Sequence, residues 1–193
     1  ATGRRANTEN LGLENTDIKV NERGFIEVDD YCQTNVENVF AVGDVNGGLQ
    51  FTYVSLDDFR VVNGYLHGNK DYTRTNRKNV PYSTFISPVL SHVGLHQAEA
   101  EENYPNVAVA SLPVANMPRG AVNQDQRGIY KVIVDKDTNL ILGATLFGKN
   151  SEEIINIIKM AIDNKIPYTY LKDQIFTHPT MAENLNDVFK LIK

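Results

Sequence analysis

The stretch "GIYKVIVDKDTNLILGATLFG", residues 128–148, has the clearest pattern of apolar and polar positions in the chain. Two runs of mainly apolar, β-branched and aromatic residues flank the polar segment "DKDTN". This arrangement is typical of a β-hairpin. Alternation in "NVAVASLPV", residues 106–114, predicts another strand, and "SHVGLHQAEAEENY", residues 91–104, predicts a strand followed by a short helix.

Two further helices are predicted near the C-terminus. In "SEEIINIIKMAIDNK", residues 151–165, the apolar residues recur with helical spacing, Ser151 is the expected N-cap, and two Glu residues fall in the first turn. A final helix is expected from about Met181 to Leu191. Residues 79–193 therefore predict an α+β domain in which helices flank an antiparallel sheet.

The first part of the chain predicts fewer elements. "GFIEVDD", residues 24–30, alternates like a half-buried strand, and residues 39–42 form a short apolar run like a strand buried on both faces. Helical spacing follows in the run "TYVSLDDFRVVNGYLHGN", and His67 and Gly68 supply the stop of this helix. Its apolar residues are expected on one side: Val54, Leu56, Phe59, Val62 and Leu66.

A polar stretch at residues 69–80 predicts a boundary that divides the chain into residues 1–78 and 79–193. The first part holds too few elements for a complete domain. The chain also opens on "ATGRRANTENLGL", with no helix or strand pattern ahead of it. We therefore expect a piece of a longer protein.

Composition narrows the classes of function. The chain has 193 residues, 41% of them hydrophobic, and a formal net charge of −5. Nucleic-acid binding is disfavoured because it needs clustered Lys and Arg, and the densest run (Arg74, Arg77 and Lys78) is interpreted as a solvated linker. The sequence has no membrane-spanning or signal-peptide pattern. Cys32 is the single cysteine, which excludes an internal disulfide, favours a small buried side chain and is consistent with the cytoplasm.

Gly43 and Asp44 end the apolar run "VFAV". A carboxylate there would lie at the carboxyl edge of a sheet, where α/β proteins bind ligands. Asp44 could accept hydrogen bonds from sugar-type hydroxyls, and Gly43 would allow the ligand to approach closely. The alternative is an ordinary polar turn, whereas the spacing does not fit a calcium loop.

Thr52 stands just ahead of the predicted helix. The N–H groups and positive dipole end of a helix can stabilise negative charge on a ligand. The alternative is that Thr52 or Ser55 only caps the helix.

His178 precedes Pro179 in "DQIFTHPTMAENLNDVF", with Glu183 five residues further on. Thr180 and Glu183 have the spacing of a capping box, which is one interpretation. The other is that Glu183 orients the His178 ring for general acid–base chemistry.

A second histidine pair, His92 and His96, is four residues apart but has no third ligand nearby, so no metal site is predicted.

Three stretches, in chain order, resemble the pyridine nucleotide-disulfide oxidoreductases, the group of glutathione reductase, dihydrolipoamide dehydrogenase and mercuric reductase. "ATGRRAN" is similar to the segment where the chain leaves the NAD-binding domain, with Ala6 where many members have Pro. "TNVENVFAVGDV" is similar to the second FAD motif, and "HPTMAE" matches the "HPT…E" signature.

The resemblance implies FAD and NAD(P)H as cofactors. It places Asp44 on the ribityl chain and Thr52 beside the pyrimidine edge of the flavin. It implies His178 as the acid–base and Glu183 as its partner, both serving the redox cysteines of the partner subunit in a homodimer. The G-x-G-x-x-G fingerprints and the Cys-x4-Cys pair of the family are absent from this sequence. We therefore expect the 193-residue chain alone to be inactive and to have little affinity for flavin.

The subtype is suggested by "GGLQFTYVSLDDFR", "RKNVPYSTF" and "DQIFTHPTMAENLNDVF". They are similar to the bacterial reactive-chlorine-resistance flavoproteins, which act as hypothiocyanous acid reductases. The expected function is the C-terminal dimerisation portion of a reductase of hypothiocyanous acid or a related oxidant. Two alternatives stay open: a stand-alone dimerisation module without catalysis, or a related reductase acting on lipoamide, glutathione or mercuric ion.

Overall fold

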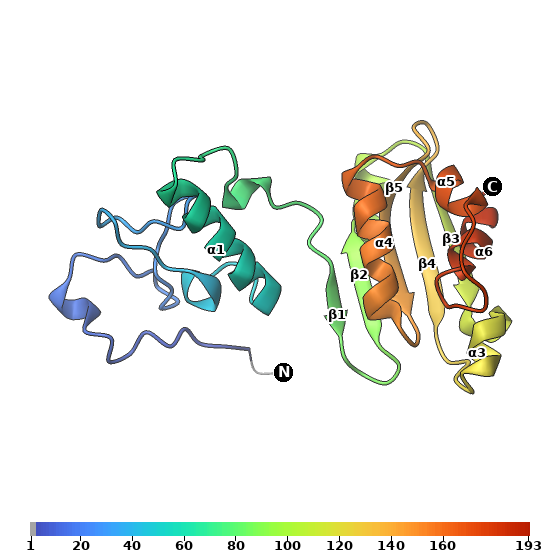
Figure 1. Cartoon of the computed structure of the whole chain (residues 1–193), viewed down its shortest axis with the longest axis horizontal. Helices are drawn as coiled ribbons and strands as arrows, with labels where there is room; N and C mark the ends of the chain where they lie inside the picture. Colours follow the sequence, from blue (N-terminus) through green and yellow to red (C-terminus); the bar gives the residue numbers. More distant parts are fainter. Residues whose placement is uncertain (1–2) are drawn as a thin grey trace. The chain divides into compact units, whose positions relative to one another are not determined.

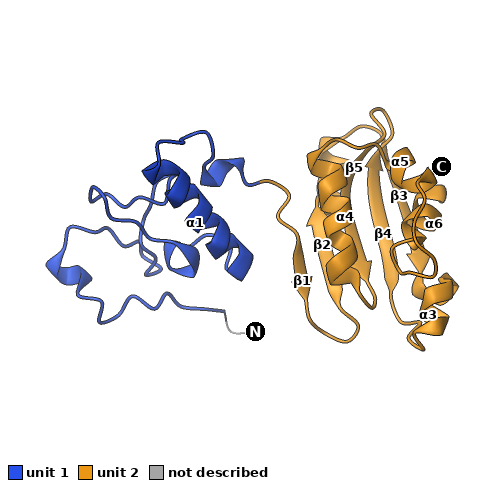
Figure 2. Ribbon diagram, viewed as in Figure 1, with its two compact units in different colours: residues 1–77 blue, residues 78–193 orange. Residues whose placement is uncertain are grey.

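The computed structural model describes residues 3–193, so the first two residues of "ATGRRAN", Ala1 and Thr2, lie outside the described part (Figure 1). The chain divides into two compact units, residues 1–77 and residues 78–193 (Figure 2). Each unit is described by itself below.

Unit 2 is built on one five-stranded sheet in the order β1-β2-β5-β4-β3. Its strands are β1 (Tyr82–Thr84), β2 (Leu90–Gly94), β3 (Val107–Pro113), β4 (Ile129–Asp135) and β5 (Leu140–Phe147). Every neighbouring pair is antiparallel, and β4 and β5 form the hairpin expected from their sequence. The predicted α+β fold with an antiparallel sheet is confirmed.

Helices cover one face of this sheet (Figure 1). The helices of unit 2 are α2 (Gln97–Asn103), α3 (Pro118–Val122), α4 (Ser151–Asp163), α5 (Tyr168–Asp173) and α6 (Asn184–Lys190). Tyr130 on β4 pairs with Leu146 on β5, and Val132 pairs with Ala144. These buried side chains form one core cluster with apolar residues of α4, α5 and α6. The sheet and the three helices are therefore held together mainly by apolar burial.

Two predicted helix starts in unit 2 are wrong in detail. Asn150, with a left-handed backbone, is the N-cap of α4, and Ser151 is the first helical residue. The Ser151 hydroxyl is buried and donates to the Val89 carbonyl, 2.9 Å away, so it serves packing against the sheet and does not cap the helix. The last helix begins at Asn184, because residues 180–183 form a turn of their own.

Unit 1 contains the helix α1 (Thr52–Leu66) and three short 3-10 turns: η1 (Leu13–Asn15), η2 (Gly43–Asn46) and η3 (Arg74–Asn76). The strands expected at residues 24–30 and 39–42 do not form as regular strands. Those segments make only isolated bridges, Val20 to Ile26 and Gln33 to Phe40. Strand identity needs a hydrogen-bonded neighbour along several residues, and residues 3–77 provide no such neighbour.

The buried face of α1 also differs from the expected one. Leu56, Phe59 and Leu66 are more than half exposed, whereas the buried positions are Val54, Asp58 and Val61. Helical spacing identified the element correctly. It could not reveal that a carboxylate would take a place on the buried face.

Candidate functional site

The turn between α5 and α6 brings His178 and Glu183 together. Nδ1 of His178 lies 2.8 Å from Oε2 of Glu183. The other oxygen, Oε1, accepts the backbone N–H of Thr180 at 2.9 Å, and the backbone N–H of Glu183 donates to the Thr180 hydroxyl at 3.2 Å. Both sets of hydrogen bonds are therefore present, and each uses a different oxygen of Glu183. The Thr180–Glu183 bonds close the turn ahead of α6 and do not cap this helix, whose N-cap is Glu183. An acid–base role of His178 stays a prediction.

Buried groups hold this turn on the domain. The Thr180 hydroxyl donates to the Thr177 carbonyl at 2.8 Å. Asn184, which is fully buried, donates to the carbonyls of Thr180 and Met181 at 3.2 and 3.1 Å. Met181 belongs to the apolar core. The backbone around the histidine is thus fixed by bonds that do not involve the imidazole.

The two side chains differ in exposure: that of His178 is 70% exposed and that of Glu183 is 19% exposed. Partial burial disfavours the charged carboxylate, but hydrogen bonds from His178 and from the Thr180 N–H outweigh it and lower the pKa of Glu183. Glu183 is therefore an anion near neutral pH. It fixes Nδ1 as the donor, and Nε2 is left to exchange a proton with a group in front of it.

Gly43 and Asp44 lie in the short turn η2, ahead of α1. The Asp44 side chain is 49% exposed, and Nη1 of Arg4 lies 3.2 Å from its Oδ2. Gly43 is buried and has a φ of 75°, and a Cβ there would meet the Ser55 hydroxyl at 2.7 Å. Glycine is required here so that the turn can pack on α1. Close approach of a ligand to Gly43 stays a prediction.

Thr52 is the exposed first residue of α1. The N-cap of this helix is Phe51, and no side chain caps it, so the alternative in which Thr52 or Ser55 is the cap is wrong. The first turn of a helix carries backbone N–H groups that have no partner within the helix.

The sequence interpretation missed Asp58. Its side chain is 1% exposed, and Oδ2 accepts the Gly43 N–H at 2.7 Å and the Asn46 amide at 2.9 Å. Oδ1 accepts Nη2 of Arg77 at 2.6 Å. Nothing in the local pattern of "SLDDF" marks which aspartate is buried.

The basic run at Arg74, Arg77 and Lys78 is not the solvated linker that we expected. The Arg77 side chain is only 12% exposed and also donates from Nε to Asp57 at 2.6 Å. Nη2 of Arg74 donates to the side-chain oxygen Oδ1 of Asn46 at 3.3 Å. Two of the three basic residues therefore bind back onto unit 1.

Other possible sites in unit 2 lack matching chemistry. The rings of His92 and His96 stack 3.8 Å apart, and both ring nitrogens of the buried His92 have partners, Thr145 and Gly94. Burial lowers the pKa of His92 and favours its neutral form. Within residues 3–193, no group of three or more His, Cys, Asp or Glu side chains could hold a metal ion.

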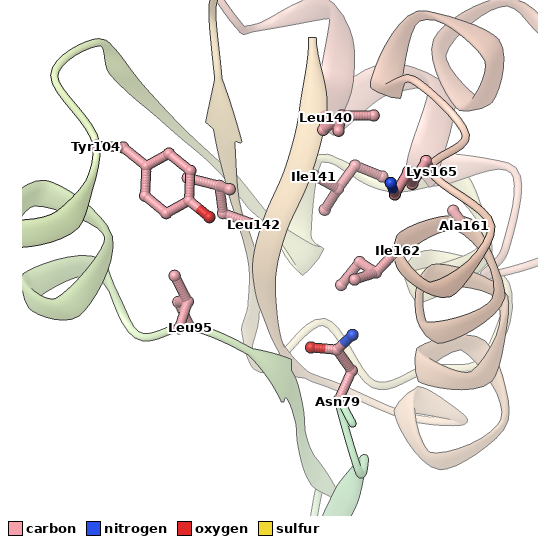
Figure 3. Close-up of a pocket in the computed structure, with 9 residues that line it drawn as sticks. All are labelled: Asn79, Leu95, Tyr104, Leu140, Ile141, Leu142, Ala161, Ile162 and Lys165. Carbon is pink, nitrogen blue, oxygen red and sulfur yellow. The ribbon is translucent and has the colours of Figure 1, made fainter. Parts of the chain in front are cut away.

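A pocket of about 290 Å³ opens between β5 and the C-terminal end of α4 (Figure 3). Its lining includes Leu142, Ile162, Tyr104 and Lys165, and it contains none of the residues predicted for catalysis or cofactor binding. In the described part of the chain, no helix has the length and apolar character to cross a bilayer.

Comparison with protein families gives two matches. Residues 80–189 match the dimerisation domain of the pyridine nucleotide-disulphide oxidoreductases, and residues 1–58 match a second family described as pyridine nucleotide-disulphide oxidoreductase.

Individual relatives agree with these matches. The chain is 51% identical, over its whole length, to the probable pyridine nucleotide-disulfide oxidoreductase RclA of Escherichia coli, of which it covers 44%. It is 32% identical to the dihydrolipoyl dehydrogenase of Corynebacterium glutamicum, with 97% of the chain and 40% of that protein covered. A solved structure of the E. coli HOCl-induced flavoprotein disulfide reductase RclA superposes with a TM-score of 0.97 at 50% identity, covering 100% of this chain and 44% of that one. The chain thus spans less than half of these relatives.

Proposed function

Since the chain belongs to the pyridine nucleotide-disulfide oxidoreductases, we propose that it forms the C-terminal part of an FAD- and NAD(P)H-dependent reductase of a disulfide or a reactive oxidant. Members of this family are enzymes that depend on FAD and NAD(P)H, and residues 80–189 are the dimerisation domain of one. His178 and Glu183 would serve the redox cysteines of the partner subunit in a homodimer.

The observation that carries the proposal is the hydrogen bond of 2.8 Å between Nδ1 of His178 and Glu183. When a thiolate leaves a disulfide, it needs a proton, and a protonated imidazole can give one from Nε2. The neutral imidazole can take the proton back in the reverse direction. Glu183 accepts from Nδ1 and keeps the ring oriented through both steps.

The groups in unit 1 fit a flavin in their chemistry. The half-exposed carboxylate of Asp44 can accept hydrogen bonds from ribityl hydroxyls. The uncapped N-terminus of α1, at Thr52, suits the electron-rich pyrimidine edge of the ring. FAD would supply the electron-transfer chemistry, and these residues would bind and orient it.

The chain is 51% identical to RclA and 32% identical to the dihydrolipoyl dehydrogenase. The solved RclA structure is described as a HOCl-induced reductase, which supports an oxidant as substrate, and we propose hypothiocyanous acid or a related species. A reductase of lipoamide, glutathione or mercuric ion is the alternative among enzymes, and a dimerisation module without catalysis is the alternative outside them. Because the proposed reaction consumes NAD(P)H, we place it in the cytoplasm.

The test compares two histidine variants of the full-length protein. His178→Ala should lower turnover with hypothiocyanous acid by roughly 10²–10⁴-fold, the size expected for loss of a general acid. Flavin content and the reduction of flavin by NAD(P)H should stay normal. The matched control is His67→Ala, an exposed histidine whose Nδ1 contacts the Asn63 carbonyl at 2.8 Å, and it should keep full turnover.

Hybrid dimers test whether His178 acts across the interface. Subunits carrying His178→Ala, mixed with subunits lacking a redox cysteine, should recover activity that neither parent has. Normal turnover of the His178→Ala enzyme would mean that His178 is only a solvated loop residue with no acid–base role. Measurable turnover by the 193-residue chain alone would also contradict the proposal.

A further inference from the structure

We propose that Asp58 is a positioning residue for the flavin-binding turn, and that Arg77 is the counter-ion that keeps this carboxylate charged and in place. The inference rests on the proposed function, since it assigns a support to the turn that carries Asp44.

The two carboxylate oxygens of Asp58 have different hydrogen-bond partners. Oδ2 faces the turn and accepts the Gly43 N–H at 2.7 Å and the Asn46 side-chain amide at 2.9 Å. Oδ1 faces away from it and accepts Nη2 of Arg77 at 2.6 Å. Gly43 and Asn46 are the two ends of η2, so one carboxylate fixes both ends of the segment that presents Asp44.

Arg77 supports the Asp58 carboxylate and is itself held in place by neighbouring side chains. Arg77 is held by two acids, because Nη2 donates to Asp58 and Nε donates to Asp57, each at 2.6 Å. The Tyr72 hydroxyl donates to the same Asp57 at 3.1 Å. Nη2 of Arg74 reaches Asn46 directly at 3.3 Å. The segment from residue 72 to residue 77 thus braces the turn through Asp58 and Asn46.

The Asp58 carboxylate is also shielded from solvent. Asp58 is 1% exposed, and burial alone would favour the neutral acid. Hydrogen bonds from Gly43, Arg77 and Asn46 outweigh burial and lower its pKa. Beside it, burial and the Asp58 charge raise the pKa of the fully buried Cys32 to about 12. Asp58 is therefore an anion in a closed setting, and its charge acts on the turn and on Arg77 instead of on solvent.

An amide at this position cannot reproduce the arrangement, because both oxygens of Asp58 accept from donors. In Asp58→Asn, the new NH₂ group must face either the Gly43 N–H or the Arg77 guanidinium, donor against donor. The double variant Asp58→Asn with Arg77→Gln removes the second conflict, since the glutamine oxygen can accept the new NH₂ and leave an oxygen toward the turn. Asp57→Asn is the matched control, because its amide oxygen can still accept from Nε of Arg77 and from the Tyr72 hydroxyl, and the hydrogen bonds and ion pairs of Asp57 go to Tyr72, Arg77 and Arg60 instead of η2.

The experiment has two readouts: FAD dissociation from the full-length protein, followed by flavin fluorescence, and amide hydrogen exchange of Gly43 in the 193-residue chain. Asp58→Asn should weaken FAD binding by about tenfold or more and speed Gly43 exchange, as expected for loss of a charge-assisted hydrogen bond. The double variant should recover part of both. Asp57→Asn should stay within about threefold of wild type, as expected for a change that keeps the acceptor for Arg77 and removes no bond to the turn.

Three results would overturn the inference while the proposed function stands: faster Gly43 exchange with unchanged FAD binding, equal losses in the Asp57 and Asp58 variants, or no recovery in the double variant. A wild-type full-length protein that takes up no FAD would overturn the proposed function itself, and this inference with it.

Discussion

The two turns that carry the candidate chemistry are held by opposite means. The turn at residues 43–46 is tied from inside by a buried carboxylate and an arginine. The turn at residues 177–183 sits on α6, whose Leu185, Val188 and Phe189 are fully buried among apolar side chains. In unit 2, apolar packing of α6 and hydrogen bonds from the buried Asn184 hold the turn, and the imidazole is exposed to solvent, where it can exchange protons.

The carboxylates in the two turns differ in the same way. In unit 1 two different carboxylates lie in the two environments: Asp58 is buried and bonds to the turn, whereas Asp44 is half exposed. In unit 2 Glu183 does both, with one oxygen on the backbone and the other on His178. Losing Glu183 should therefore affect the turn and the histidine together, whereas Asp44 and Asp58 can be varied separately.

The largest expected effect is on the apolar support of the second turn. Phe189→Ala should lower the free energy of unfolding of unit 2 by about 3–5 kcal/mol, because Phe189 is fully buried in the core cluster and a cavity would remain. Chemical denaturation of the 193-residue chain, followed by circular dichroism, measures it. Val122→Ala, at a position that is 61% exposed, is the control and should change stability by no more than about 0.5 kcal/mol. Equal effects of the two variants would mean that α6 is not the support of this turn.

The next largest effect is expected when the buried ion pair behind the first turn is broken. Arg77→Leu leaves the Asp58 charge without its cation and should destabilise unit 1 by about 3 kcal/mol. Amide exchange of Val54 and Val61 in α1 reports it. Arg60→Leu, which removes an arginine that is 61% exposed and 3.6 Å from Asp57, should cost no more than about 0.5 kcal/mol.

The wild type and the Arg77→Leu variant should also differ in how the stability of unit 1 changes at acid pH. The folded pKa of Asp58 lies below its ordinary value of 3.8, so its contribution to stability is complete above pH 3.8 and is lost as the pH falls through the folded pKa. Without Arg77 the folded pKa rises, and unit 1 should lose less stability in that acid range than the wild type does. Parallel pH profiles would show that Arg77 does not keep Asp58 ionised.

The smallest effect is expected for the exposed pair. His178→Ala should change stability by at most about 0.5 kcal/mol, since the imidazole is 70% exposed and other bonds fix the backbone of the turn. Carbon-13 NMR should nevertheless show the pKa of Glu183 rising toward its ordinary value of 4.5. Lys190→Ala, which breaks another exposed pair on α6, should leave the Glu183 titration in place. A Glu183 titration that is the same in the His178→Ala protein would mean that the hydrogen bond is not kept in solution.

Prediction from the apolar–polar pattern was correct where the deciding interactions are local. The β4–β5 hairpin was predicted from two apolar runs around a polar turn, and α1 and α4 were predicted from helical spacing. It failed at residues 24–30 and 39–42, because a strand is defined by a neighbour and the alternation of one segment does not supply one. It also failed on the faces of α1, where apolar Leu56 and Phe59 are exposed and Asp58 is buried.

The sequence by itself predicted an antiparallel sheet in unit 2 and the helix that follows the Gly43–Asp44 turn, and it offered the pairing of His178 with Glu183 as one of two interpretations. The helix and the pair depend on periodicity and on contacts within about five residues, whereas the sheet joins residues far apart in the chain, such as Leu90 and Phe147. Only the tertiary structure decided that Asp58 is buried and that Arg77, 19 residues away, neutralises it. A charge can stay buried only if partners from several segments meet it, and that meeting is a property of the folded chain.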